Sequence, residues 1–232
     1  MNRMNRMNHK NRALAAGSLL GALVFLGGCA TPPAPYDYTA FQKAKPATLL
    51  VLPPLNESPE VKATPGVWAH STRPLAEAGY YVLPVALVDE TFKQNGIQTA
   101  AQAHEISPNK LREVFGADAA VYIKVTRYGT SFKVLSSETR VDVEARIVDL
   151  RSGDLLWSGR AFATSAEQNQ QTPGGLVGLL VAAAVNQIIG TATDASFKFA
   201  GLAQARLLSA PRSNGVLPGP RSPLYGQPPP TR

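Results

Sequence analysis

Two runs of alternating apolar and polar residues constrain the fold of this 232-residue chain more than any other feature. Residues 119–125 place Ala, Val or Ile at every odd position, and residues 141–147 repeat this pattern against charged residues. A period of two is typical of strands with one face on a core and the other in water. Turn residues at 149–153 lead into a third strand that begins at Leu155. The sequence therefore predicts an antiparallel meander of three strands.

The first half of the chain follows other patterns. Residues 48–52 form a short apolar run closed by two prolines, which is typical of a strand buried on both faces, and residues 80–83 predict a second strand. Residues 53–70 contain several prolines and are expected to form a long irregular loop. Helices are predicted where an apolar side is bounded by capping residues, proline or glycine: residues 72–78, 84–94 and 108–115, and a last helix that begins after Thr193 or Asp194.

The first 28 residues have the pattern of a secretory signal peptide. Four basic residues precede an apolar run from Ala13 to Leu26, which is too short to span a bilayer. The run ends in Leu-Gly-Gly before Cys29, and this pattern resembles the lipobox of bacterial lipoproteins. The resemblance implies cleavage before Cys29 and its lipidation, with palmitate among the acyl groups. The start of the chain stays open among Met1, Met4 and Met7.

Charge and composition bound the remaining chain. Without the four signal-peptide cations, 19 of the 23 Lys and Arg remain against 16 Asp and Glu, so the net charge falls from +7 to +3. A nearly neutral body argues against a nucleic-acid partner. Residues 29–46 are predicted to be the lipidated cysteine and a proline-rich tether with a reach of about 55 Å. Residues 47–208 are predicted as one compact domain, and residues 209–232 as a disordered proline-rich tail.

Catalytic chemistry has little support in the sequence. His70, Ser71 and Asp89 could be combined into a hydrolase site, but there is no nucleophile elbow motif, and polar loop residues are the preferred interpretation. No catalytic, metal-binding or cofactor-binding residues are therefore predicted. Long loops and aromatic residues often contact partners, so Trp68, Tyr80 and Tyr81 are the candidate partner contacts, although core packing is the preferred interpretation for Tyr81. The apolar stretch from Leu176 to Ile189 predicts a helix in the core, at an interface or on a membrane.

Two stretches resemble known families. Residues 148–157 contain an Asp, a Ser-Gly turn and a Trp, and they are similar to a strand-turn-strand of the TolB amino-terminal domain and of the curli-secretion lipoprotein. Residues 74–96 resemble uncharacterised outer-membrane lipoproteins noticed as surface antigens of Gram-negative bacteria. The likeness covers roughly residues 46–208. It implies an α/β (α+β) domain with a mixed sheet, the meander and flanking helices, related to the TolB amino-terminal fold, but it supplies no catalytic residues.

These observations predict an outer-membrane lipoprotein that acts as a non-enzymatic binding component in envelope transport or assembly. Ala30, next to the lipidated cysteine, is not the aspartate associated with inner-membrane retention, and a periplasm-facing domain is expected. The predicted partners are the membrane, through the lipid anchor, and envelope proteins that include a second copy of the chain. Two alternatives stay open: an oligomeric secretion pore built from the Leu176 helix or the alternating strands, and a lipid-anchored hydrolase of the cell envelope.

Overall fold

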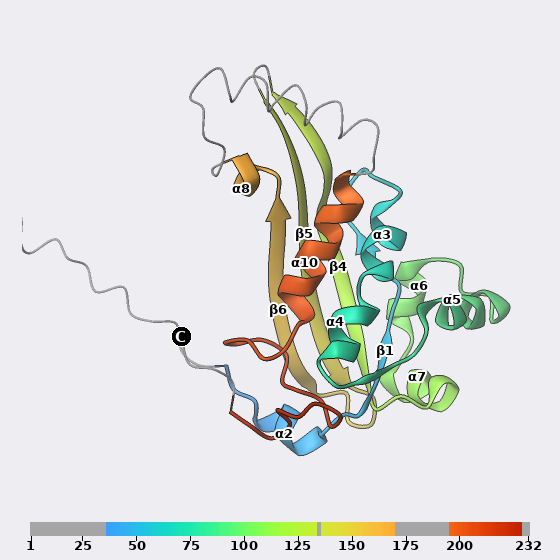
Figure 1. The fold of residues 1–232 in the computed structure, drawn as a ribbon. Helices are drawn as coiled ribbons and strands as arrows, with labels where there is room; N and C mark the ends of the chain where they lie inside the picture. Colours follow the sequence, from blue (N-terminus) through green and yellow to red (C-terminus); the bar gives the residue numbers. More distant parts are fainter. Residues whose placement is uncertain (1–35, 134–135, 170–194, 229–232) are drawn as a thin grey trace, which may run out of the picture. The chain divides into compact units, whose positions relative to one another are not determined.

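A mixed sheet forms the centre of the domain. The computed structural model describes residues 36–133, 136–169 and 195–228, and in these residues six strands pair in the order β3-β1-β4-β5-β6, with β2 joined to β4 (Figure 1). β1 is parallel to β3 and β4, whereas β4, β5 and β6 run antiparallel, which confirms the predicted meander. The strands are β1 (Thr48–Val51), β2 (Leu55–Asn56), β3 (Tyr81–Val82), β4 (Ala119–Lys133), β5 (Ser136–Asp149) and β6 (Leu155–Thr164).

The alternating residues define the two faces of the meander. Val121 of β4, Ile147 of β5 and Trp157 of β6 lie opposite one another and are buried in the core. β4 continues to Lys133, well beyond the predicted end of the alternation. A bulge between Val125 and Arg127 shifts the register there, so the sequence pattern ends although the strand does not.

Helices cover both faces of the sheet to different extents. They are α2 (Thr39–Ala44), α3 (Ala63–Ala69), α4 (Thr72–Glu77), α5 (Val85–Gln94), α6 (Ala100–Glu105), α7 (Pro108–Phe115), α8 (Ala166–Asn169) and α10 (Ala195–Leu208). α10 lies along β4, β5 and β6 on one face, next to α3 and α4, and buries Ala200, Ala203 and Leu207 (Figure 1). The predicted caps of α7 are confirmed, because Ser107 caps its start and Gly116 ends it with φ of 66°.

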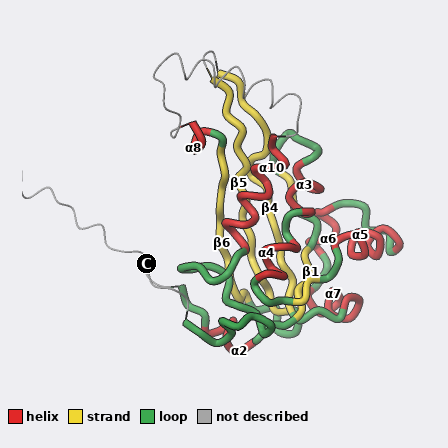
Figure 2. Tube along the Cα trace, viewed as in Figure 1, coloured by secondary structure: helices red, strands yellow, loops and turns green. Residues whose placement is uncertain are grey.

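The expected loop over residues 53–70 is wrong. This stretch contains β2 and α3 (Figure 2). Pro65 is compatible with a helix because it lies in the first turn of α3, where backbone N–H groups have no partner within the helix. α6 was not predicted either, although Thr99 and Gln102 form a capping box at its start.

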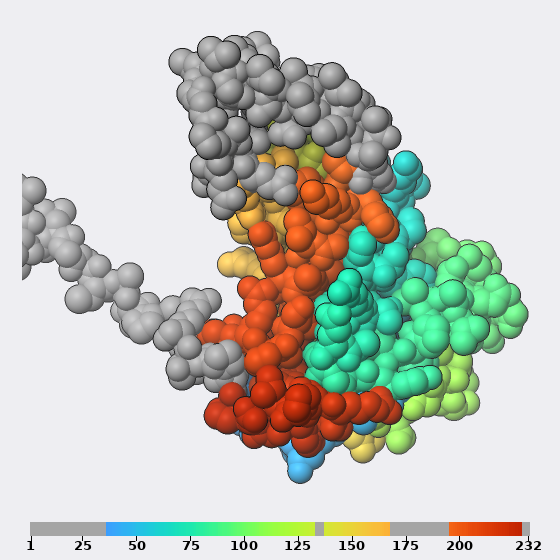
Figure 3. Space-filling view, viewed as in Figure 1, coloured from blue at the N-terminus to red at the C-terminus, as the bar shows by residue number. Residues whose placement is uncertain are grey.

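Parts of the predicted tether and of the predicted disordered tail belong to the folded domain. Tyr38, just before α2, and Phe41, on α2, are buried in the core. The described domain therefore begins at residue 36 and not at residue 47. Residues 209–228, which we call the C-terminal segment, run across the end of the domain that carries α2 (Figure 3). Three of its backbone carbonyls accept hydrogen bonds from aromatic side chains of the body: Tyr38 (2.5 Å), Tyr80 (2.6 Å) and Trp157 (3.1 Å).

β6 lies at one edge of the sheet. Its Ser158 N–H donates a hydrogen bond to the Tyr36 hydroxyl at 3.0 Å, and its Phe162 carbonyl accepts one from Arg206 at 2.7 Å. Tyr36 precedes the first strand, and Arg206 lies in α10, which follows the last strand. Side chains from these two segments, and not another strand, therefore bond to the edge of β6. Cys29 and the stretch from Leu176 to Ile189 lie outside the described residues, among which no helix is long and apolar enough to cross a membrane.

Candidate functional site

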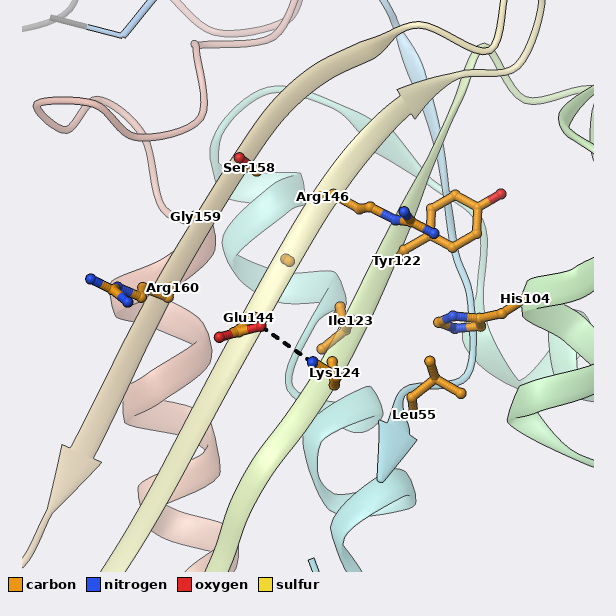
Figure 4. A pocket seen from close by; sticks show the side chains of 11 residues that line it. Leu55, His104, Tyr122, Ile123, Lys124, Glu144, Arg146, Ser158, Gly159 and Arg160 are labelled. Atoms are coloured by element: carbon orange, nitrogen blue, oxygen red, sulfur yellow. Dashed lines mark ion pairs between the residues drawn. The ribbon is translucent and has the colours of Figure 1, made fainter. Parts of the chain in front are cut away.

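The face of the meander opposite α10 carries a row of polar and charged side chains. A hollow of about 610 Å³, which we call the sheet-face pocket, opens on this face (Figure 4). Leu55 of β2 and His104 of α6 form its wall. Its floor is formed by residues of all three meander strands, among them Tyr122, Lys124, Glu144, Arg146, Ser158 and Arg160. Strand pairing sets this floor, because Tyr122 faces Arg146, which in turn faces Ser158.

Aromatic rings hold one arginine in place. The Arg146 guanidinium lies 4.7 Å from the centre of the Tyr122 ring, and the His104 ring meets the same tyrosine edge-on at 5.2 Å (Figure 4). His104 Nε2 donates a hydrogen bond to the Pro53 carbonyl at 3.0 Å, which fixes the histidine on the loop before β2. Because Tyr122 is itself buried, Arg146 is oriented by a rigid support.

The charges of the pocket are unevenly paired. Lys124 Nζ is 3.3 Å from Glu57 and 3.6 Å from Glu144, so both carboxylates share this lysine. Arg146 and Arg160 are exposed, and in the described part of the chain no carboxylate lies within 4.0 Å of either guanidinium. The pocket therefore offers two cationic groups to an anion from solution.

Burial shifts the pKa values of the groups behind this surface. Desolvation lowers the pKa of His104, the nearby Arg146 charge lowers it further, and the hydrogen bond to Pro53 partly opposes both effects. Burial raises the pKa of Tyr122, so its hydroxyl stays protonated at physiological pH. The neutral His104 ring, with its Nε2 proton bonded to the Pro53 carbonyl, supports Tyr122 from the side.

Acidification is expected to lower the free energy of unfolding between pH 7.5 and 5.5. Burial lowers the pKa of both His70 and His104 from the ordinary value of 6.5, so folding favours their neutral forms. Their contribution is complete above pH 6.5 and is lost as the pH falls below it. Urea denaturation at the two pH values should show a smaller decrease for the His70→Gln/His104→Gln variant. An equal decrease in that variant would contradict the assignment.

Two of the three aromatic residues predicted to contact partners are buried. Trp68 is 8% exposed and donates its indole N–H to the Val51 carbonyl, and Tyr80 is 4% exposed beneath the C-terminal segment. Those two predictions are wrong, because both rings are used within the fold. Tyr81 is 50% exposed on β3, with the Arg221 guanidinium 5.5 Å from its ring, which contradicts core packing and leaves it available to a partner away from the pocket.

The residues considered for a hydrolase do not converge. Ser71 is fully buried, donates to the Val67 carbonyl and accepts from Gln204, while His70 packs on Phe197 of α10. Asp89 forms an exposed ion pair with Lys93 on α5 at 2.6 Å. Among the residues that the structure describes, no group of three or more His, Cys, Asp or Glu side chains could hold a metal ion.

Only part of the sheet-face pocket can be predicted from the sequence. The alternation over residues 141–147 correctly placed Glu144 and Arg146 on a water-facing row, and it was interpreted as a solvated face. No sequence pattern indicates that His104 belongs to the pocket. It lies on α6, 18 positions before Tyr122, and only the packing of this helix brings the two rings together. Arg160 could have been found by extending the alternation into the third strand, where it lies opposite Glu144.

The fold and the pocket define a single mixed α/β domain with one open polar sheet face. The chain belongs to the family described as "Putative lipoprotein GNA1162-like", which matches residues 36–221. The predicted membership of a lipoprotein family is thereby confirmed. The match includes most of the C-terminal segment, in agreement with its packing on the body.

Known relatives support this assignment. The "Putative lipoprotein NMB1124/NMB1162" of Neisseria meningitidis serogroup B (strain ATCC BAA-335 / MC58) is 50% identical over 203 residues, which are 87% of this chain and 94% of the relative. The crystal structure of lipoprotein GNA1162 from Neisseria meningitidis is 52% identical, with a TM-score of 0.50 over 62% of this chain and 99% of that chain. The predicted fold class is confirmed by this likeness.

Proposed function

We propose that this chain is an outer-membrane lipoprotein that binds an envelope protein, without enzymatic activity, in transport or assembly. The sheet-face pocket is the observation that carries the proposal, because it leaves two exposed guanidinium groups on an open face next to ordered aromatic rings. Interfaces are enriched in arginine and aromatic residues. The likeness to surface antigens and a relation to the TolB amino-terminal fold stay predictions.

The proposed anchor keeps the domain close to the bilayer. Cys29 precedes Tyr36, the first described residue, by seven positions, and seven residues span at most about 25 Å. This reach is less than half of the 55 Å that the sequence predicts for a tether ending at residue 46. The end of the domain that carries α2 would then lie next to the membrane, with the domain in the periplasm.

Site-specific photocross-linking in intact cell envelopes tests the proposal. A benzoylphenylalanine at Ser158, which is exposed in the pocket, is expected to form an adduct with one defined envelope protein. The same group at Glu90, exposed on α5, is the control and should not form that adduct. The Cys29→Ser variant is expected to leave the membrane fraction. Identical adducts from both positions, or none from Ser158, would reject the meander face as the binding surface.

A further inference from the structure

Arg146 and Arg160 stand on neighbouring strands of the sheet-face pocket, displaced by two residues. Arg146 of β5 lies opposite Ser158, and Arg160 of β6 lies opposite Glu144. The Cα atoms of diagonal neighbours of this kind are about 7–8 Å apart. Figure 4 shows Arg146 reaching toward the Tyr122 ring and Arg160 on β6 beyond Glu144. The two side chains point away from each other in this view, so a ligand must extend across the strands to meet both guanidinium groups.

Glu144 determines what kind of anion fits between them. Its carboxylate is 3.6 Å from Lys124, which it shares with Glu57, so the middle of the pocket has no spare positive charge. A compact, multiply charged anion placed there would face this carboxylate. Two single charges that are separated along a chain avoid it, because each can meet one arginine while uncharged atoms pass over Glu144.

The geometry of Arg146 favours a carboxylate as its ligand. One face of the guanidinium is occupied by the Tyr122 ring, which leaves the N–H groups along its edge for an acceptor. A planar guanidinium fork matches the two oxygens of a carboxylate. Since the Tyr122 ring, supported by His104, already holds Arg146, little side-chain freedom is lost when the ligand binds.

We propose that the sheet-face pocket binds an extended acidic segment of a partner protein, with separate carboxylates on Arg146 and Arg160. This inference rests on the proposed function and specifies the chemistry of the partner. The leucine and tyrosine of the wall and floor supply apolar contacts for the intervening side chains, and the Ser158 hydroxyl is available to the backbone of the segment. Arg160 is the less restrained of the two cations and adds the second charge.

The test measures binding of a fluorescent peptide with glutamate at alternate positions to the full-length protein in neutral detergent. Fluorescence anisotropy should detect binding to the wild type, and the same peptide with glutamine in place of glutamate should bind at least tenfold more weakly. The Arg146→Gln/Arg160→Gln variant is expected to lose at least tenfold in affinity. The Arg146→Lys/Arg160→Lys variant should retain part of it, because the charges remain without the bidentate fork.

A charge-matched control separates the pocket from general electrostatics. The Arg73→Gln/Arg112→Gln variant removes two exposed cations outside the pocket and should bind within twofold of the wild type. Equal losses in both double variants, no binding to the wild type, or equally effective displacement by inorganic phosphate would each overturn the inference. If the Ser158 adduct forms but withstands Arg146→Gln/Arg160→Gln, the proposed function stands and the acidic ligand does not. Absence of the Ser158 adduct in the wild-type background as well would reject the meander face as the binding surface, and with it the proposed function that this face carries.

Discussion

A chain that ends at Ser209 is expected to lose about 3 kcal/mol of its free energy of unfolding. Truncation removes the carbonyls that accept hydrogen bonds from Tyr38, Tyr80 and Trp157. Because truncation also exposes these donors to water, each lost hydrogen bond costs about 0.5–1.5 kcal/mol. The loss also uncovers the site of Val216, which is buried in the core. Urea denaturation, followed by tryptophan fluorescence, measures the change.

A shorter truncation serves as the control for this result. A chain that ends at Pro228 keeps the three hydrogen bonds and the backbone contacts of Gly219 with Ala78 and of Arg221 with Gly79. It should unfold at the same urea concentration as the full chain. If the chain ending at Ser209 were equally stable, the C-terminal segment would not be an integral part of the fold.

The Trp157→Ala variant is expected to lose about 3–5 kcal/mol, as other buried aromatic truncations do. Trp157 is 1% exposed, packs in the core of the meander and donates its indole N–H to the C-terminal segment. Trp157→Phe should cost less, because it keeps a ring and loses the hydrogen bond. Thermal or urea unfolding of the two variants measures the difference, and equal losses would assign the effect to the hydrogen bond rather than to packing.

Gly159 provides an independent check on this packing. A Cβ atom at that position would lie 2.4 Å from the Trp157 ring, so Gly159→Ala should destabilise the wild type by about 1–3 kcal/mol. The same substitution in the Trp157→Ala background should cost much less, because the obstructing ring is gone. A double-mutant cycle measures this coupling, and additive losses would contradict the close contact.

Elements with a local sequence pattern could be predicted, whereas elements that depend on contacts between distant residues could not. The meander could be predicted because alternation along residues 119–125 and 141–147 is a local property that survives any tertiary context. The ordered structure of the C-terminal segment could not be predicted from the sequence. Its prolines cannot bury a core of their own, and its order depends on donors up to 177 positions away, such as Tyr38. Composition alone therefore indicated disorder.

The candidate site divides in the same way. The outward direction of Glu144 and Arg146 follows from the strand period, and this part was predictable. The support of Arg146 by Tyr122 and His104 depends on how α6 packs against the sheet, and no local pattern encodes that packing. Trp68 and Tyr80 failed as partner contacts for the same reason, since their burial depends on distant backbone carbonyls.

The bridged edge of β6 has a consequence for how neighbouring copies of the chain can meet. An exposed edge strand offers unpaired backbone groups to any neighbouring chain, and pairing of this kind leads to open-ended aggregation. Tyr36 occupies the Ser158 N–H and Arg206 occupies the Phe162 carbonyl, so an incoming strand would first have to displace side chains on either side of Arg160. Strand pairing between copies of the chain along β6 is therefore hindered.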